Sequence, residues 1–365
     1  MAGPEATVTV MDIRISKTMN HDAVKNILIR GTNWIGDVVM TLPAFAAVRK
    51  TFPRAKITVL VKPWVAALFD LCPDVDEVFT FQSPGIHEGV FGKVGLAREL
   101  RKKKFDMAVL LQNAIEAAII ARLAGIPIRI GYNSDVRGFL LTHSVRRTKA
   151  IRQVPQIDYY LEMLKTAGFQ SAGREVHLPL NAEYQALGDK LLNGFGLTAG
   201  KMICGIAPGA AYGPAKKWFP ERYAAVADRL AASHNAQVLM MGSEADRASL
   251  DAVQGFAKSR LVNLAGKTDL QEAIALIARC RLFISNDSGL MHVAGALGIP
   301  TVAVFGSTNP ATTSPVGEKS TVIYKGVPCS PCLKKVCPTD FACMDKISVD
   351  DVYDTARKLL AEKGP

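Results

Sequence analysis

The chain has 365 residues, 49% of them hydrophobic, and its 44 Lys and Arg exceed its 33 Asp and Glu by a formal net charge of +11. This length is too great for one ordinary core and predicts two domains of a globular α/β protein. No apolar run reaches the ~18 residues that cross a bilayer, and no basic start followed by an apolar stretch opens the chain, so a cytoplasmic protein is predicted. The positive charge favours anionic partners such as nucleotides, phosphorylated lipids or nucleic acid, without choosing among them.

Residues 1–25 show no sustained hydrophobic period and are predicted to form a disordered tail. Residues 26–43 then pass from an apolar run through a glycine turn into a helical pattern, which predicts a strand, a loop and a helix. Helix starts at the carboxyl end of a parallel sheet favour anions. Asp37 lies where that preference would not place a carboxylate, so it is either a helix cap or a base directed at a second substrate.

Two familiar glycine loops are excluded at this turn. The spacing of Gly31 and Gly36 mimics a Walker loop, but Asp37 and Val38 replace the Lys and Ser or Thr that would reach phosphates and magnesium. The Gly-x-Gly-x-x-Gly fingerprint of dinucleotide sites is absent from the turn. A kinase or ATPase is therefore excluded, and NAD is not expected.

Strands and helices continue to alternate through the first half, as in a doubly wound domain. The predicted strands are 55–61, 77–80, 105–111 and 129–132, and the predicted helices are 44–49, 96–104, 114–124 and 158–167. The stretch 135–156 is irregular and basic, with Arg137, Arg146 and Arg147 among its cations. It is either a substrate loop that contacts an acceptor or an ordinary exposed loop.

The second half repeats the pattern. Its predicted strands are 202–207, 237–241, 261–264, 282–284 and 301–305, with helices after the first, third and fourth of them. Thr268 or Asp269 is a plausible cap for the helix that ends at residue 278. The fold class predicted is α/β, with two Rossmann-like doubly wound domains, 26–180 and 181–346, that face a central cleft.

Two segments of the second half could bind a diphosphate. The turn 286–292 follows a strand and opens a helix, so its backbone N–H groups and the Ser288 hydroxyl could hold phosphate oxygens. Asp287 could instead be a helix cap, and His292 could be a core histidine. Lys217 precedes the apolar anchor Trp218, and a fixed ammonium there would offset charge on a departing diphosphate; the alternative is a surface lysine.

Three segments together resemble glycosyltransferase family 9. They are GTNWIGDVVMTLP at 31–43, PGA with GPAKKW at 208–218, and NDSGLMHVA at 286–294. The resemblance covers residues 26–360 and is specific, because three motifs occur in the same order and in the same domains. It implies a GT-B fold and an inverting glycosyl transfer that needs no metal or other cofactor.

The resemblance also implies the substrates. The donor is ADP-heptose, held mainly by the C-terminal domain, and the acceptor is a phosphorylated Kdo-lipid A glycolipid that reaches the N-terminal domain. Heptosyl-Kdo-lipid A would receive an L-glycero-D-manno-heptose, with the enzyme peripheral at the inner face of the cytoplasmic membrane. Nucleic acid is not an expected partner, because the basic residues show no aromatic interleaving.

A role is implied for each matching residue. Asp37 becomes the general base that takes the proton of the acceptor hydroxyl, and Lys217 stabilises the diphosphate. The implied donor contacts are Ser288, Gly289 and His292 at the phosphates, Asp287 near the sugar, Glu244 at the ribose, and Thr268 and Leu270 at the adenine. Contacts of Arg137, Arg146 and Arg147 with the acceptor remain a hypothesis from charge.

Other functions stay open at this point. A related enzyme could add the first heptose or use a different acceptor, and a nucleotide-sugar epimerase of similar architecture would use no lipid acceptor. A non-catalytic module would bind a nucleotide sugar or lipopolysaccharide without turnover. Release of ADP in the presence of defined acceptors separates these alternatives.

The seven cysteines divide into two groups. Cys72, Cys204 and Cys280 lie in apolar surroundings and are predicted to be buried and inert. The other four occur close together as Cys329, Cys332, Cys337 and Cys343. They could hold a structural zinc or iron–sulfur site, remain reduced thiols, or form disulfides.

The last predicted helix covers residues 350–362 and places Val352, Ala356, Leu359 and Leu360 on one face. A segment of residues 347–365 is expected to return to the N-terminal domain and pack there. Its deletion should then destabilise the protein.

Overall fold

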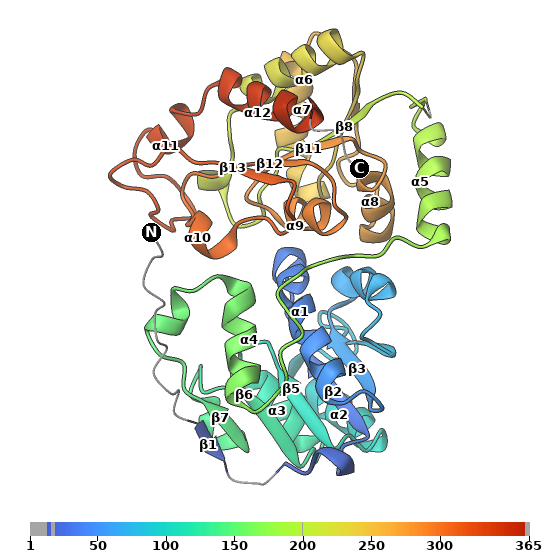
Figure 1. Cartoon of the computed structure of the whole chain (residues 1–365), viewed down its shortest axis with the longest axis vertical. Coiled ribbons are helices and arrows are strands. Elements are labelled where there is room, and N and C mark those ends of the chain that lie inside the picture. Colours follow the sequence, from blue (N-terminus) through green and yellow to red (C-terminus); the bar gives the residue numbers. More distant parts are fainter. Residues whose placement is uncertain (1–12, 16–18, 199, 362–365) are drawn as a thin grey trace. The chain divides into compact units, whose positions relative to one another are not determined.

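The structure is a computed structural model that describes residues 13–15, 19–198 and 200–361. The chain divides into two compact units (Figure 1). The first consists of Met1–Asn33, Thr41–Phe69 and Pro73–Arg174, and the second of Trp34–Met40, Asp70–Cys72 and Glu175–Pro365. The second unit therefore includes the opening turns of the first long helix, which carry Asp37.

The first unit is built on a seven-stranded sheet in the order β1-β7-β6-β5-β2-β3-β4. All neighbouring strands are parallel except β1, which is antiparallel to β7. The strands are β1 (Ile13–Ile15), β2 (Asn26–Arg30), β3 (Lys56–Val61), β4 (Glu77–Thr80), β5 (Met107–Leu110), β6 (Ile128–Tyr132) and β7 (His143–Val145). Central strands such as β5, MAVL, are apolar throughout because helices cover both faces of a parallel sheet.

The helices of this unit are α1 (Ile35–Thr51), α2 (Gly89–Lys102), α3 (Ile115–Leu123) and α4 (Gln156–Thr166), with shorter 3-10 turns that include η2 (Pro63–Leu71) and η3 (Arg137–Leu140). Helices α2 and α3 cover one face of the sheet. Their side chains Leu96, Leu100 and Ala121 pack in one core with Leu28 of β2 and Leu110 of β5.

Two predictions for the first unit need correction. Ile13–Ile15 pair with β7 as an edge strand, and His21–Ala23 form a helical turn, so these residues are not a disordered tail. Residues 1–12 and 16–18 lie outside the described part of the chain. The stretch 135–156 is not an irregular loop, because it contains η3, β7 and a third short turn, Ala150–Arg152.

The second unit has a six-stranded, wholly parallel sheet in the order β10-β9-β8-β11-β12-β13. Its strands are β8 (Ile203–Ala207), β9 (Gln237–Met240), β10 (Leu261–Asn263), β11 (Leu282–Asn286), β12 (Thr301–Val304) and β13 (Ser320–Ile323). The chain runs outward in one direction from β8 and in the other from β11. The point where the order reverses, between β8 and β11, is where doubly wound sheets bind ligands.

The helices of the second unit are α5 (Ala182–Gly194), α6 (Pro220–His234), α7 (Arg247–Phe256), α8 (Leu270–Ile277), α9 (Gly289–Ala296), α10 (Pro310–Thr313), α11 (Ala342–Asp345) and α12 (Val349–Ala361). Helices α5, α7, α10 and α11 and strand β13 have no counterpart in the sequence prediction. Within the described ranges, no helix combines the length and the apolarity needed to cross a bilayer.

The apolar face of α12 is buried in the second unit. Val352, Ala356 and Leu359 belong to the core cluster that contains Trp218 and the β11 residue Ile284. Arg229 of α6 also bonds Asp350 at 2.5 Å. The prediction that this helix packs back on the N-terminal domain is therefore wrong, because its apolar stripe completes the core of the sheet that immediately precedes it.

Candidate active site

The point where the strand order reverses is held together by Asn286 at the end of β11. Its side chain is fully buried, and its Oδ1 accepts hydrogen bonds from the Trp218 backbone N–H and the Tyr223 hydroxyl, both at 2.9 Å. Its Nδ2 donates to the Pro208 carbonyl at 2.7 Å. One amide thus fixes the loop 208–218 after β8 against the turn after β11.

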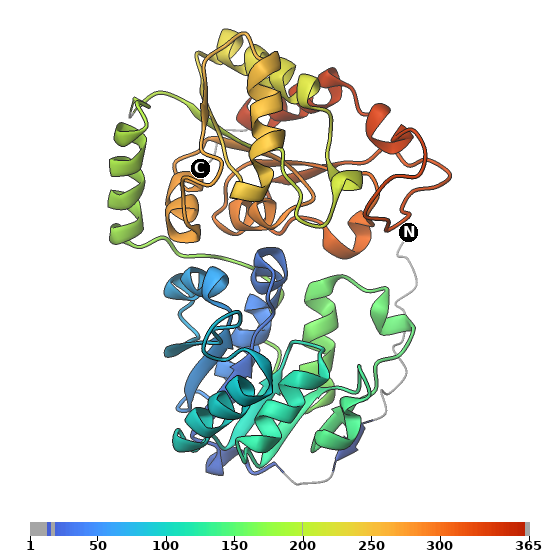
Figure 2. The same cartoon turned by 180° about the vertical axis from the view of Figure 1, so that it is seen from behind.

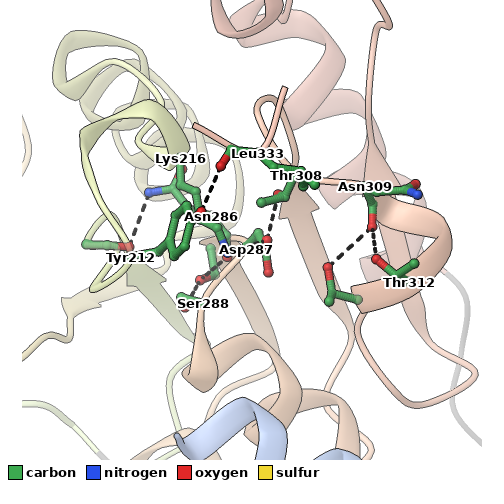
Figure 3. Close-up of polar contacts among 12 residues, drawn as sticks. Tyr212, Lys216, Asn286, Asp287, Ser288, Thr308, Asn309, Thr312 and Leu333 are labelled. Carbon is green, nitrogen blue, oxygen red and sulfur yellow. Dashed lines mark hydrogen bonds and ion pairs between the residues drawn. The ribbon is translucent and has the colours of Figure 1, made fainter. Parts of the chain in front are cut away.

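Lys216 and Asp287 meet across this junction. The Lys216 Nζ lies 2.6 Å from the Asp287 Oδ2, and the side chains are only 14% and 6% exposed. The Thr308 hydroxyl donates to the same Oδ2 at 2.6 Å, and the Lys216 Nζ lies 5.0 Å from the ring centroid of Tyr212 (Figure 3). The ion pair is therefore largely shielded from solvent, and it lies at the carboxyl ends of the parallel strands.

Lys217 has a different environment. Its Nζ donates to the Ser249 hydroxyl on α7 at 2.8 Å. The short 3-10 turn Pro214–Lys216 ends just before it, and Lys217 is extended with φ −86° and ψ 128°, so consecutive lysine side chains diverge. The structure therefore brings Lys216 to Asp287, whereas Lys217, the residue predicted to stabilise the diphosphate, contacts Ser249.

The loop that carries Lys216 is held in place by residues 329–343, which contain the four clustered cysteines and which we call the cysteine-rich segment. The Ala215 N–H donates to the Lys335 carbonyl at 3.0 Å, and the Tyr212 hydroxyl donates to the Leu333 carbonyl at 2.7 Å. The Leu333 N–H donates to the Ser307 carbonyl at 2.8 Å, next to Thr308. The segment therefore links the two loops whose side chains contact Asp287 (Figure 3).

Asp37 occupies the third position of α1, which begins at Ile35, so it lies inside the first turn and not at the N-cap. The side chain is half-buried. Burial raises the pKa of Asp37 to about 6, an effect that the charge of Lys216 opposes and that of Asp287 reinforces. The carboxylate is mostly ionised at neutral pH and basic enough to accept a proton there.

Glycines let the start of α1 approach the start of α9. A Cβ at Gly36 would stand 2.9 Å from the His292 Cδ2, and a Cβ at Gly289 would stand 2.8 Å from the Ile35 Cβ. His292 is 2% exposed, and burial lowers its pKa to about 4, so the ring is neutral at physiological pH. Among the described residues its Nδ1 has no hydrogen-bond partner. Neutral His292 would bring no positive charge to a phosphate.

Ser288 precedes the first residue of α9, Gly289, and is partly exposed. Its hydroxyl lies 2.8 Å from the Ser285 hydroxyl and forms no side-chain cap of the helix. The first backbone N–H groups of α9 are thus left for another acceptor, which an anion suits.

Three predicted donor contacts follow the ends of β9 and β10. Glu244 is exposed and forms an ion pair with Arg247 at 2.5 Å, and a Cβ at Gly266 would stand 2.1 Å from its Oε2. Thr268 and Leu270 are partly exposed on either side of Asp269. Asp269 is the cap of α8, since its Oδ1 accepts from the Glu272 N–H at 2.8 Å. All these residues lie at the same edge of the sheet as Lys216.

The acceptor hypothesis for Arg137 is wrong. This side chain is 0% exposed, and its guanidinium donates to backbone carbonyls, including Tyr132 at 2.8 Å and both Leu110 and Ala114 at 3.3 Å. Burial lowers its pKa to about 10, which still leaves it charged. Arg146 and Arg147 are exposed beyond β7 and can meet a partner.

The four clustered cysteines do not form a ligand set. Cys329 is exposed, Cys332 and Cys337 are partly exposed, and Cys343 is buried beneath Gly306. In the described part of the chain no three His, Cys, Asp or Glu side chains are placed to hold a metal ion, and none of these four thiols is in a disulfide. In this structure the four cysteines are therefore free thiols, which is one of the three alternatives that the sequence leaves open. Cys72, Cys204 and Cys280 are buried, as predicted.

Sequence reasoning missed three residues of this site: Lys216, Thr308 and Tyr212. Lys216 is the neighbour of Lys217 in the same motif, and Pro214 two positions earlier signals the turn that sets its direction. Thr308 and Tyr212 belong to no pattern that distinguishes them from other loop residues.

Comparisons with known proteins agree with this geometry. The profile of glycosyltransferase family 9 (heptosyltransferase) matches residues 94–342. Lipopolysaccharide heptosyltransferase 2 of Escherichia coli K12 is 32% identical over 305 residues, which cover 81% of this chain and 87% of that protein.

Solved structures give the same result. The structure of E. coli ADP-heptose lps heptosyltransferase II matches with a TM-score of 0.77 and 28% identity, over 92% of this chain and 98% of that one. A glycosyl transferase family 9 protein from Veillonella parvula matches with a TM-score of 0.82 and 25% identity, over 94% and 99%. The predicted fold class, an α/β protein of the GT-B type with two Rossmann-like sheets, is confirmed, and the chain belongs to glycosyltransferase family 9 (heptosyltransferase).

Proposed function

We propose that the chain transfers L-glycero-D-manno-heptose from ADP-heptose to heptosyl-Kdo-lipid A of the lipopolysaccharide inner core, with inversion at the anomeric carbon. The observation that carries this proposal is Asp37, a carboxylate with a raised pKa, beside the Lys216–Asp287 ion pair. A base and a buried cation are the two groups that such a displacement needs. The similarity to heptosyltransferases that act at this step supports the choice of acceptor.

In the proposed reaction, an acceptor hydroxyl attacks the anomeric carbon of the heptose while Asp37 takes its proton. The bond between that carbon and the diphosphate oxygen breaks, and ADP leaves with the electron pair. A carboxylate with a pKa of about 6 is mostly ionised at pH 7 and still basic enough to assist the transfer.

Lys216 is proposed to stabilise the charge that develops on the departing diphosphate, in place of Lys217. Its ammonium is already held in a nearly dry position by Asp287, so little reorganisation is needed when the charge appears. Ser288, which precedes α9, and the first N–H groups of that helix, beginning at Gly289, complete the proposed phosphate site. With positive charge supplied by Lys216 and a helix start, the reaction is proposed to need no metal.

The second unit is proposed as the donor side and the first unit as the acceptor side. Asp287 would lie near the heptose, neutral His292 would line the phosphate site by shape, Glu244 would bind the ribose, and Thr268 and Leu270 the adenine. Glu244 would exchange its contact with Arg247 for the ribose hydroxyls. Exposed Arg146 and Arg147 would face acceptor phosphates. Because the acceptor is a glycolipid, the enzyme would work at the inner face of the cytoplasmic membrane.

The test is ADP release from ADP-heptose with Kdo-lipid A that carries no heptose or one heptose. Wild type should release ADP rapidly only with the one-heptose acceptor. Asp37→Asn should lower the rate about 10²- to 10⁴-fold, as expected for loss of a general base, and leave ADP affinity unchanged.

Release with the heptose-free acceptor alone would replace the proposed acceptor with that of the preceding transfer. ADP-heptose binding without release with either acceptor would overturn the proposed reaction. Full activity in Asp37→Asn would remove Asp37 from the role of base.

A further inference from the structure

The first unit exposes large apolar side chains on α2, α3 and η3 and on the turns that lead into α2 and η3. They are Ile86, Val90, Phe91, Ile119, Leu123, Val136 and Phe139, and we call them the apolar face. Phe91 is 91% exposed and Val136 is 79% exposed. A cluster of this size on three neighbouring elements differs from the single exposed apolar residues that are normal on protein surfaces.

These elements form one continuous surface. Lys93 at the start of α2 lies 2.5 Å from Glu116 at the start of α3, and Arg101 near the end of α2 donates to the Leu123 carbonyl at 2.6 Å. The two helices are therefore joined at both ends and lie side by side in front of the first sheet (Figure 2). Asp135, next to Val136, accepts from the Ile115 N–H at 2.7 Å and so attaches η3 to the start of α3.

Ile86, Val90 and Phe91 lie on or next to a turn, residues 82–88, that hydrogen bonds hold in place. His87 is 3% exposed, and its Nδ1 accepts from the Gln82 N–H at 3.0 Å, while Lys62 donates to the Ser83 carbonyl. A Cβ at Gly92 would stand 2.4 Å from the His87 carbonyl carbon, so the first turn of α2 rests directly on this loop. Ile86, Val90 and Phe91 are thus held outward by a rigid support.

Exposed cations lie on the same elements as the apolar face. Those on α2, α3 and the turn after α2 are Arg98, Arg101, Lys102, Lys104 and Arg122. One acid of these helices is already paired, since Glu116 lies beside Lys93. Apolar tips among cations suit the interface of an anionic bilayer, where side chains enter the headgroup region and cations meet lipid phosphates.

We propose that the apolar face is the surface by which this protein docks on a bilayer that contains anionic phospholipid. A bilayer accepts separate protruding tips without a matching surface, whereas a protein partner must supply complementary pockets. The proposal rests on the proposed function in one respect, because a glycolipid acceptor has to be reached in its membrane. It deepens that function by assigning the membrane contact to particular elements.

The first test is flotation of the full chain with phosphatidylcholine vesicles and with vesicles that also contain phosphatidylglycerol. Wild type should float only with the anionic vesicles, and less so as salt screens the attraction. The double substitution Val90→Ser with Phe91→Ser should weaken the partitioning about tenfold or more, as loss of two apolar anchors predicts. Phe256→Ser is the matched control, because Phe256 is 59% exposed on α7 and should not matter.

A position-specific readout accompanies flotation. A tryptophan in Phe91→Trp should shift its emission to the blue on anionic vesicles, and one in Phe256→Trp should not. Wild type that stays with the lipid-free fraction, or a double variant that floats like wild type, would overturn the proposal. The proposal would also be overturned if wild type self-associates in sedimentation and the double variant does not, while the double variant still binds vesicles. The apolar face would then join two copies of the chain.

Activity separates this proposal from the proposed function. The double variant should release ADP like wild type with a dispersed, delipidated acceptor, but about tenfold more slowly with the acceptor in anionic vesicles. Turnover by wild type without vesicle binding would reject the docking surface alone. Vesicle binding through Phe91 without turnover would reject the enzymatic proposal alone.

Discussion

Arg137 in the first unit and Lys216 in the second are both cations with little access to solvent, and both follow the carboxyl end of a strand in a parallel sheet. Within the part of the chain that the structure describes, the Arg137 guanidinium donates to backbone carbonyls of its own unit. The Lys216 ammonium forms an ion pair with the Asp287 carboxylate. It also lies close enough to a second carboxylate, Asp37, to oppose part of the rise in pKa that burial causes there.

The difference between these two sites lies in what a ligand could replace. Carbonyls that Arg137 satisfies belong to the backbone and would be costly to leave unpaired, so the interaction stabilises the fold. A diphosphate can compete with Asp287 for the Lys216 ammonium, because it offers oxygens of the same charge. Burial of a cation is thus weak evidence of function until its partner is known.

Of the two cations compared, Lys216 should have the larger effect on activity when its ammonium is removed. Lys216→Met is expected to lower kcat/KM for ADP-heptose about 10²- to 10³-fold, the range for loss of one preorganised group that stabilises transition-state charge. Lys217→Met is the matched control and should change kcat/KM by less than about threefold, because its Nζ contacts Ser249 instead. Initial rates of ADP release measure both, and a larger loss in the control would reverse the assignment.

Arg137→Met should act on stability and not on chemistry. Loss of the guanidinium leaves several buried carbonyls without a donor, so the free energy of unfolding should fall by about 3 kcal/mol or more. Urea denaturation measures this change, with exposed Arg152→Met as a control expected to lie within about 0.5 kcal/mol of wild type. A variant with unchanged stability but weakened acceptor binding would restore Arg137 as a recognition residue.

The ionised Asp37 carboxylate should lower the stability of the folded protein by an amount that depends on pH. Because its folded pKa is raised to about 6, the native state holds a proton that the unfolded state has lost between its ordinary range and pH 6. Wild type therefore loses stability as pH rises to about 6, with the full cost above it. Asp37→Asn should be more stable by about 1–2 kcal/mol at pH 8, and this gain should disappear near pH 4.

The same pKa sets the acid limb of activity. Wild-type kcat/KM should fall about tenfold per pH unit below pH 6, since the base must be ionised in the free enzyme. Thermal melts and initial rates across this range check both statements. A stability gap that widens as the pH falls would mean that the charge of Lys216 outweighs burial.

The smallest effect is expected at Tyr212. Tyr212→Phe removes the 2.7 Å hydrogen bond to the Leu333 carbonyl but keeps the ring beside Lys216, so kcat/KM should fall only about two- to tenfold. Tyr324→Phe is the control, because Tyr324 accepts from the Ser330 hydroxyl, three residues before Leu333 in the same segment. Equal losses in both variants would mean that Tyr212 acts only through the stability of that segment.

Much of the fold follows from local sequence patterns. Apolar runs such as those of β2, β5 and β8 need burial on both faces, and the glycines after β2 mark the turn into α1. Strand β7 escaped prediction because three residues in a basic stretch carry too little periodicity. The amphipathic stripe of α12 indicates that it is buried, but not which sheet buries it.

The sequence identifies the loops of the candidate site, but not all the side chains that meet there. The motif around 213–218 identifies the loop, yet whether Lys216 or Lys217 points to Asp287 depends on the turn at Pro214 and on contacts with distant backbone. Likewise, no local pattern separates buried Arg137 from exposed Arg147. Both distinctions depend on tertiary partners that lie far away along the chain.

The brace on the Lys216 loop has a consequence for the substitutions that this protein can accept. The cysteine-rich segment holds its two neighbouring loops through main-chain groups of Leu333 and Lys335, while the side chains of Leu333 and Val336 are 59% and 62% exposed. The side chains at these two exposed positions can therefore change, but the number of residues in the segment cannot. A one-residue insertion or deletion between Cys332 and Cys337 would displace both carbonyls, so this segment should vary in composition and hold its length.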